Sequence, residues 1–92
     1  MAVVMVQKWV TNSADEAVAA VRTLAQGTFY DGVTLTIAEA RVRKIHQYWK
    51  VPLVPSHWPE RNSALYEDMA IIEEGLRAKG IDDIILTLSE RS

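Results

Sequence analysis

The sequence predicts a two-layer α+β fold, in which a small three- to four-stranded sheet has three helices on one face. Two Ser/Thr-x-x-Glu capping boxes, at Ser13 and Thr36, precede stretches with helical apolar spacing. Stretches rich in β-branched and aromatic residues, typical of strands, begin near Val3, Thr28 and Ile84. The 92 residues, 49% hydrophobic and 24% charged, fit one globular domain, residues 1–92.

The first expected elements are a strand over Val3–Val10 and a helix from about Ala14 to Gln26. The strand is continuously apolar at its start, which favours a central position in the sheet. In the helix, Ser13 and Glu16 form the capping box, and apolar residues follow at helical spacing. Gly27 stands where a left-handed residue would end the helix.

The stretch Thr28–Thr36 is rich in strand-forming residues around Asp31-Gly32. An Asp-Gly pair between such residues is typical of a hairpin, because both central residues of the turn need a positive φ. The arms of this hairpin would be about three residues long, so a single bulged strand is an equal alternative.

A second helix is expected over residues 37–50. At about 100° per residue, one contiguous apolar arc contains Ile37, Ala38, Val42, Ile45, Tyr48 and Trp49. Arg41 points into this arc, so it must snorkel, pair with an acid from another element or face a ligand. Pro52, Pro55 and Pro59 then impose an extended linker over Val51–Pro59.

The third helix should begin at Asn62 or Ser63 and reach about Lys79, and a final strand should follow over Ile84–Leu88. The third helix has two apolar stripes, so we expect it to contact a sheet on one side and a helix or a second subunit on the other. The first stripe consists of Leu65, Met69, Ile72 and Leu76, and the second of Ala64, Ile71, Gly75 and Ala78. The resulting order, β-α-β(β)-α-α-β, is loosely ferredoxin-like. A sheet this small has exposed edges, and together with the second stripe this predicts a homodimer.

Composition narrows the function classes. The net charge of −2 argues against a protein that binds phosphate groups in general. Because the sequence contains no cysteine, metal sites with thiolate ligands are excluded. The two histidines, His46 and His57, lack metal-ligand spacing, so we expect neither a metal nor a cofactor. No signal peptide or segment of about 20 apolar residues is evident, so a cytoplasmic protein without membrane contact is expected.

The favoured function is a non-catalytic binding or interaction domain that associates with itself and with other proteins. The expected contact surface combines a cation, a histidine and aromatic residues: Arg41, Tyr48, Trp49, His57 and Trp58. One alternative is a regulator that contacts nucleic acid through Arg43, Lys44 and Lys50 of the basic helix 37–50. The other is a small-molecule-binding protein or acid–base enzyme with an anion near Arg41.

Overall fold

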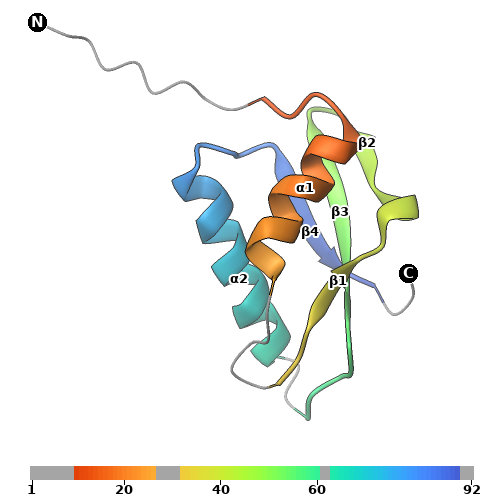
Figure 1. Ribbon diagram of the computed structural model, residues 1–92, viewed down its shortest axis with the longest axis vertical. Helices are drawn as coiled ribbons and strands as arrows, with labels where there is room; N and C mark the ends of the chain where they lie inside the picture. The colour runs from red at the N-terminus through yellow and green to blue at the C-terminus, as the bar shows by residue number, and fades with distance from the viewer. Residues whose placement is uncertain (1–9, 27–31, 61–62, 90–92) are drawn as a thin grey trace, which may run out of the picture.

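The computed structural model describes residues 10–26, 32–60 and 63–89. Its elements in chain order are α1 (Ala14–Ala25), β1 (Leu35–Ile37), the 3₁₀ turn η1 (Glu39–Arg41), β2 (Arg43–Ile45), β3 (Tyr48–Pro55), α2 (Ser63–Ala78) and β4 (Ile84–Leu88). The four strands form one sheet, and both α-helices lie on the same face of it (Figure 1). The α+β class and the small sheet are therefore confirmed. Neither described helix is long and apolar enough to span a bilayer.

Helix α1 begins where the first capping box predicts. The Glu16 amide donates to the Ser13 hydroxyl at 3.2 Å, and the Glu16 carboxylate accepts from the Asn12 amide at 2.7 Å. These bonds satisfy amides that a helix N-terminus otherwise leaves unpaired. The buried face of the helix consists of Ala17, Val18, Val21 and Ala25.

Helix α2 buries the first of its two predicted stripes, which consists of Leu65, Met69, Ile72 and Leu76. The second stripe faces α1 at Gly75, because a Cβ built on Gly75 would lie 2.8 Å from Leu24 Cδ2. Glycine thus lets the two helices approach closely. Two other members of that stripe, Ile71 and Ala78, are exposed, so the described contact with α1 accounts for only part of the stripe, and a second partner for the rest stays a prediction.

The predicted helix over residues 37–50 is wrong. This stretch contains the end of β1, the turn η1, strand β2, a two-residue turn and the start of β3. Neither member of the second capping box caps a helix, since Thr36 Oγ1 donates to the Val54 carbonyl at 3.3 Å and Glu39 pairs with Arg22. β2 and β3 form a hairpin whose turn has His46 at a φ of 55°. β-branched and aromatic residues suit strands, and tertiary pairing overrides the helical spacing.

The predicted proline linker is also corrected, because Val51 to Pro55 form the second half of the central strand β3. β1 pairs with Leu53–Pro55 and β2 with Tyr48–Lys50, so both lie along one edge of β3, and η1 interrupts that edge opposite Pro52. Pro52 has no N–H to offer the Ala38 carbonyl, which instead accepts from the Arg41 amide at 2.9 Å. The 3₁₀ turn thus satisfies a carbonyl that the proline leaves unpaired.

The opposite edge of β3 is occupied by β4, which was predicted over the same residues, Ile84–Leu88. β4 runs parallel to β3 and is its direct neighbour, with Val51 in register with Leu86. A ferredoxin-like order would place another strand between the two strands that α2 connects, so that order is not confirmed. The predicted strand Val3–Val10 and Asp31 of the predicted hairpin lie outside the described residues, apart from Val10, which is not in a strand.

Candidate binding face of the sheet

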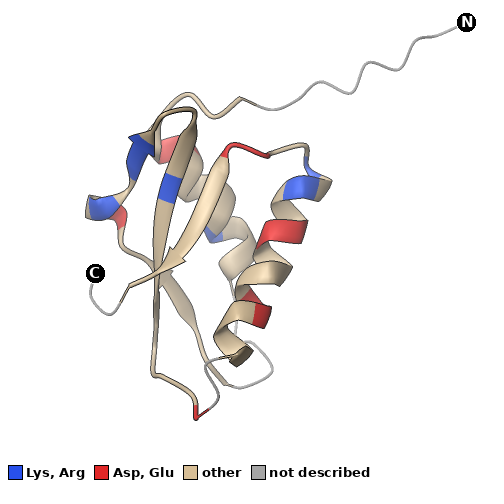
Figure 2. Ribbon diagram, turned by 180° about the vertical axis from the view of Figure 1, so that it is seen from behind, with Lys and Arg blue, Asp and Glu red and all other residues tan. Residues whose placement is uncertain are grey.

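The two faces of β3 have different surroundings. Trp49, Val51 and Leu53 point toward the helices and join the hydrophobic core. The alternating residues, which include Tyr48 and Lys50, point the other way because successive side chains of a strand lie on opposite faces. No described helix covers this second face, which is turned to the viewer in Figure 2. We call it the open face.

Strand register places two rows of side chains across the open face. Arg43 of β2, Lys50 of β3 and Ile85 of β4 are in register and form one row. Ile45 and Tyr48 form the adjacent row and are each 45% exposed. Directly opposed residues of neighbouring strands have Cβ atoms about 5 Å apart, so the side chains of Arg43 and Lys50 leave the sheet beside each other.

Beside these rows the open face contains a hollow of about 360 Å³, which we call the basic hollow. It is bordered by β2, β3, η1 and the end of β4, and its lining residues are Arg41, Arg43, Ile45, Lys50, Pro52, Thr87, Leu88 and Ser89. Three of these residues are cations and two carry hydroxyl groups, whereas none is a carboxylate. The basic hollow therefore has the chemistry of a site for anionic groups.

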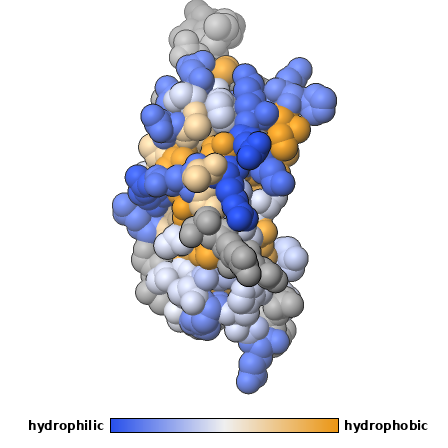
Figure 3. Space-filling model, turned by 90° about the vertical axis from the view of Figure 1, so that its right-hand side faces the viewer, coloured by the Kyte–Doolittle hydropathy of each residue, from blue (hydrophilic) through white to orange (hydrophobic). Residues whose placement is uncertain are grey.

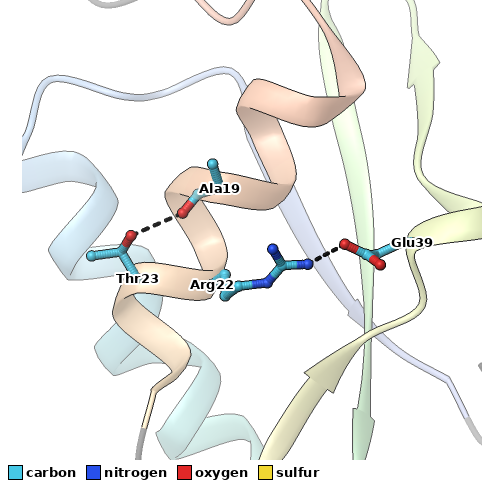
Figure 4. Close-up of polar contacts among 4 residues, drawn as sticks. All are labelled: Ala19, Arg22, Thr23 and Glu39. Carbon is cyan, nitrogen blue, oxygen red and sulfur yellow. Dashed lines mark hydrogen bonds and ion pairs between the residues drawn. The ribbon is translucent and has the colours of Figure 1, made fainter.

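The three cations of the basic hollow are exposed, and within the described part of the chain none of them forms an ion pair. Arg41 Nη1 donates to Ser89 Oγ at 3.2 Å, which holds the guanidinium toward the end of β4. By contrast, Arg22 of α1 is paired with Glu39 of η1, outside the basic hollow (Figure 4). Figure 3 views the edge that η1 and β2 form, where strongly hydrophilic side chains adjoin a smaller apolar area.

The position of Arg41 follows from the backbone rather than from a helix face. Its amide closes the 3₁₀ turn opposite Pro52, and this turn places the residue beside the open face. The sequence offers three explanations for Arg41, namely snorkelling, pairing with an acid or facing a ligand. Among the described residues, Arg41 does not pair with an acid. The side chain is exposed and lines the basic hollow, and its contact with a ligand stays a prediction.

The structure separates the other predicted contact residues. Tyr48 lies on the open face, but Trp49 points to the helix side, where its Nε1 donates to the Thr11 carbonyl at 3.0 Å. Lys44 is also on the helix side, with its Nζ 5.8 Å from the Trp49 ring centre. Both His57 and Trp58 follow β3, seven and eight residues after Lys50, and the strand rise of about 3.3 Å per residue separates them from the basic hollow.

The open-face residues contributed by β4 and its end, Ile85, Thr87 and Ser89, are not among the contact residues that the sequence predicts. All three come from β4 or follow it directly, and they alternate with the inward-facing Ile84, Leu86 and Leu88. The alternation of this strand was the available signal. It could not indicate proximity to Arg43 and Lys50, because the pairing of β4 with β3 joins segments about 35 residues apart.

Among the residues that the structure describes, no group of three or more histidine or acidic side chains could hold a metal ion. No model of a known protein family matches the chain, and searches of curated proteins and of solved structures yield no significant match.

Proposed function

We propose that this protein is a non-catalytic binding module whose open face binds an acidic segment of a partner protein. The observation that supports this function is the basic hollow, where Arg41, Arg43 and Lys50 meet without a carboxylate. Carboxylates of a partner would supply the missing counter-charges, and guanidinium groups bind carboxylates through two parallel hydrogen bonds. Ile45, Tyr48 and Ile85 supply exposed apolar area beside the cations.

The energetics of the sheet support an anionic partner. Like charges directly opposed across two strands are destabilising, and Arg43 and Lys50 are such a pair. A bound carboxylate between them would replace this repulsion by two attractions. The open face is thus expected to be electrostatically unfavourable when free and favourable when occupied.

Binding explains the basic hollow better than catalysis does. Histidines and carboxylates are the commonest general acids and bases, and the lining of the basic hollow contains neither. An acid–base enzyme with an anion near Arg41 therefore remains the weaker alternative.

An acidic protein segment also suits the open face better than nucleic acid. The chain has a net charge of −2, which opposes a densely charged polyanion. Of the cations expected to contact nucleic acid, Arg43 and Lys50 share the open face, but Lys44 lies on the other side of the sheet. Tyr and Arg beside apolar residues are typical of protein interfaces.

Anisotropy of a fluorescein-labelled peptide of alternating Glu and Leu residues tests this function. We expect Arg43→Glu to raise the Kd at least about tenfold, which corresponds to about 1.4 kcal/mol. Lys44→Glu is the matched control, because it makes the same charge change one residue along the strand on the opposite face. We expect it to change the Kd less than about twofold.

A second titration uses labelled single-stranded oligothymidylate. Tighter binding of this probe than of the peptide, weakened by Arg43→Glu, would assign the open face to nucleic acid and overturn the proposed partner. Failure of the wild-type protein to bind either probe at low salt would overturn the binding function itself.

Self-association, which the sequence predicts, is part of the proposed function. It is supported by the outer edge of β4, since β4 pairs with β3 alone among the described strands. Its geometry is developed below.

A further inference from the structure

The outer edge of β4 presents a regular row of backbone groups. The Trp49 amide donates to the Asp83 carbonyl at 2.7 Å, and the Ser89 amide donates to the Leu53 carbonyl at 2.8 Å. In a parallel ladder, every second residue of a strand forms its backbone hydrogen bonds with the same neighbouring strand. The backbone groups of Asp83, Ile85, Thr87 and Ser89 therefore face β3. The N–H and C=O groups of Ile84, Leu86 and Leu88 consequently point away from β3, toward the open edge.

Among the described residues, this edge lacks the features that usually prevent strand pairing. Its five residues, Ile84–Leu88, include no charged residue and no proline, and the strand is uninterrupted. The other edge of the sheet, in contrast, is broken by η1 and bears Arg43 and Lys44. A new strand would therefore add to β4 in preference to β1 or β2.

Helix α2 presents a self-complementary charge pair beside the β4 edge. Glu73 and Arg77 border a hollow of about 210 Å³ together with Ile84 and Ile85. Both lie about 200° around the helix from Gly75, whose Cβ position faces α1, so they point away from α1. A two-fold axis that passes between them would bring Glu73 of one copy against Arg77 of the other.

We propose that β4 pairs antiparallel with β4 of a second copy of this chain, with Leu86 at the two-fold axis. This register places Ile84 opposite Leu88 and lets all the outward N–H and C=O groups of the two strands bond. It joins the two sheets into one, and it places Glu73 of each copy against Arg77 of the other copy. The interface is isologous, as most homodimer interfaces are.

The dimer places both basic hollows on the same face of the joined sheet. Neighbouring strands are about 4.8 Å apart, so the two Lys50 residues are about 14 Å apart across the strands and the two Arg43 residues about 24 Å. The inference about ligands rests on the proposed function: a partner with two acidic segments would engage both basic hollows at once. Such a ligand gains affinity through effective concentration without any new contact.

Sedimentation velocity over roughly a hundredfold range of concentration tests the dimer. We expect the wild-type protein to form dimers and Glu73→Arg to weaken the dimer at least about tenfold, since the introduced guanidinium would then face Arg77 of the other copy. Arg77→Glu should weaken it similarly, whereas an equimolar mixture of the two variants should restore it as a heterodimer, because opposite charges then face each other. A wild-type monomer throughout the range, or a mixture no more dimeric than its components, overturns the proposed interface.

Ile84→Pro gives a second test that does not depend on the charges. It removes one outward N–H from each copy at the first residue of β4, where proline costs no bond to β3. Ile84→Val retains the N–H and is the matched control. Dimerisation that Ile84→Pro leaves unchanged would exclude the β4 edge.

A tandem peptide separates the dimer inference from the proposed function. Two acidic Glu-Leu peptides joined by about 12 Gly/Ser residues span about 19 Å, which matches the separation of the basic hollows. We expect the wild type to bind the tandem peptide at least about tenfold more tightly than the single peptide, and Glu73→Arg to lose this advantage while retaining single-peptide affinity. Loss of single-peptide binding in the wild type would overturn the proposed function alone, whereas equal affinities for the two peptides in a proven dimer would overturn the shared ligand surface.

Discussion

Replacing Lys50 by glutamate should stabilise the fold and remove ligand binding at the same time. Lys50 is opposed across the ladder by Arg43 and shares the basic hollow with Arg41. In the wild type, both neighbours repel it, and no described acid pairs with any of the three residues. Lys50→Glu converts these repulsions into attractions without changing the buried core.

The expected gain follows from the geometry of the pair. A directly opposed like-charge pair costs roughly 0.2–1 kcal/mol, and an opposite-charge pair contributes a similar amount in the other direction. The two contributions together amount to about 0.4–2 kcal/mol. Because Arg43 and Lys50 are exposed, screening keeps this sum in its lower part, at about 0.5–1 kcal/mol. For a domain of this size each kcal/mol moves Tm by about 4–8 °C, so Lys50→Glu should raise Tm by about 2–8 °C.

Thermal denaturation at low ionic strength and in about 1 M salt measures this effect, since the Debye length falls to about 3 Å in 1 M salt. The gain should shrink in high salt, and it should largely vanish when Arg43 is first replaced by alanine. Lys44→Glu is the control on the opposite face, where loss of the cation–π contact with Trp49 predicts a slightly lower Tm. An unchanged or lower Tm for Lys50→Glu at low salt would refute the electrostatic account of the open face.

Two further substitutions test the packing of the helices and the attachment of the segment before α1. In a Leu24→Ala background, Gly75→Ala should stabilise the protein by about 0.8–1 kcal/mol through helix propensity. With Leu24 present this gain should be lost, because the new Cβ would lie 2.8 Å from Leu24 Cδ2. A coupling energy below about 0.5 kcal/mol between the two substitutions, measured by urea denaturation, would contradict this. Asp83→Ala should lower the free energy of unfolding by about 2–4 kcal/mol, because the carboxylate accepts from the buried Thr11 at both its amide (2.7 Å) and its hydroxyl (2.8 Å). Thr11→Val, which removes the hydroxyl bond alone, should cost less, and equal losses would show that the amide bond contributes nothing.

The elements that depend on local signals could be predicted from the sequence. Helix α1 follows from the Ser13 capping box and its apolar spacing, and the stripe of α2 from Leu65 to Leu76 is buried as expected. Strand β4 was placed over the same residues that form it. In each case the residues that decide the structure lie within one or two turns or within one strand.

The secondary structure of residues 37–50 could not be predicted in the same way, because their apolar residues fit both helical spacing and strand alternation. Ile37, Ile45 and Trp49 lie on one arc at helical spacing, and Trp49 also starts the alternation with Val51 and Leu53 that β3 uses. The choice depends on β4, whose Leu86 pairs with Val51 from 35 residues away. No local pattern contains that information.

The candidate site shows the same division between residue type and placement. Arg41, Arg43 and Lys50 were selected from the sequence for their charge, and the basic hollow contains all three. The sequence groups Lys44 with Arg43 and Lys50 on a helical face, but strand alternation places Lys44 on the other side of the sheet. The signal for charge was local, whereas the grouping depended on the secondary structure assigned to the stretch.

Pro52 connects the central strand to the candidate site. A residue with an N–H at this position could bond the Ala38 carbonyl, and the strand formed by β1 and β2 could then continue without interruption. Proline forbids that bond, so the Arg41 amide takes the carbonyl and the chain makes a 3₁₀ turn. The turn both breaks the edge of β1 and β2, which disfavours strand addition there, and moves Arg41 to the basic hollow. One proline in the middle of β3 thus helps to determine which edge of the sheet stays available for pairing and where its positive charge gathers.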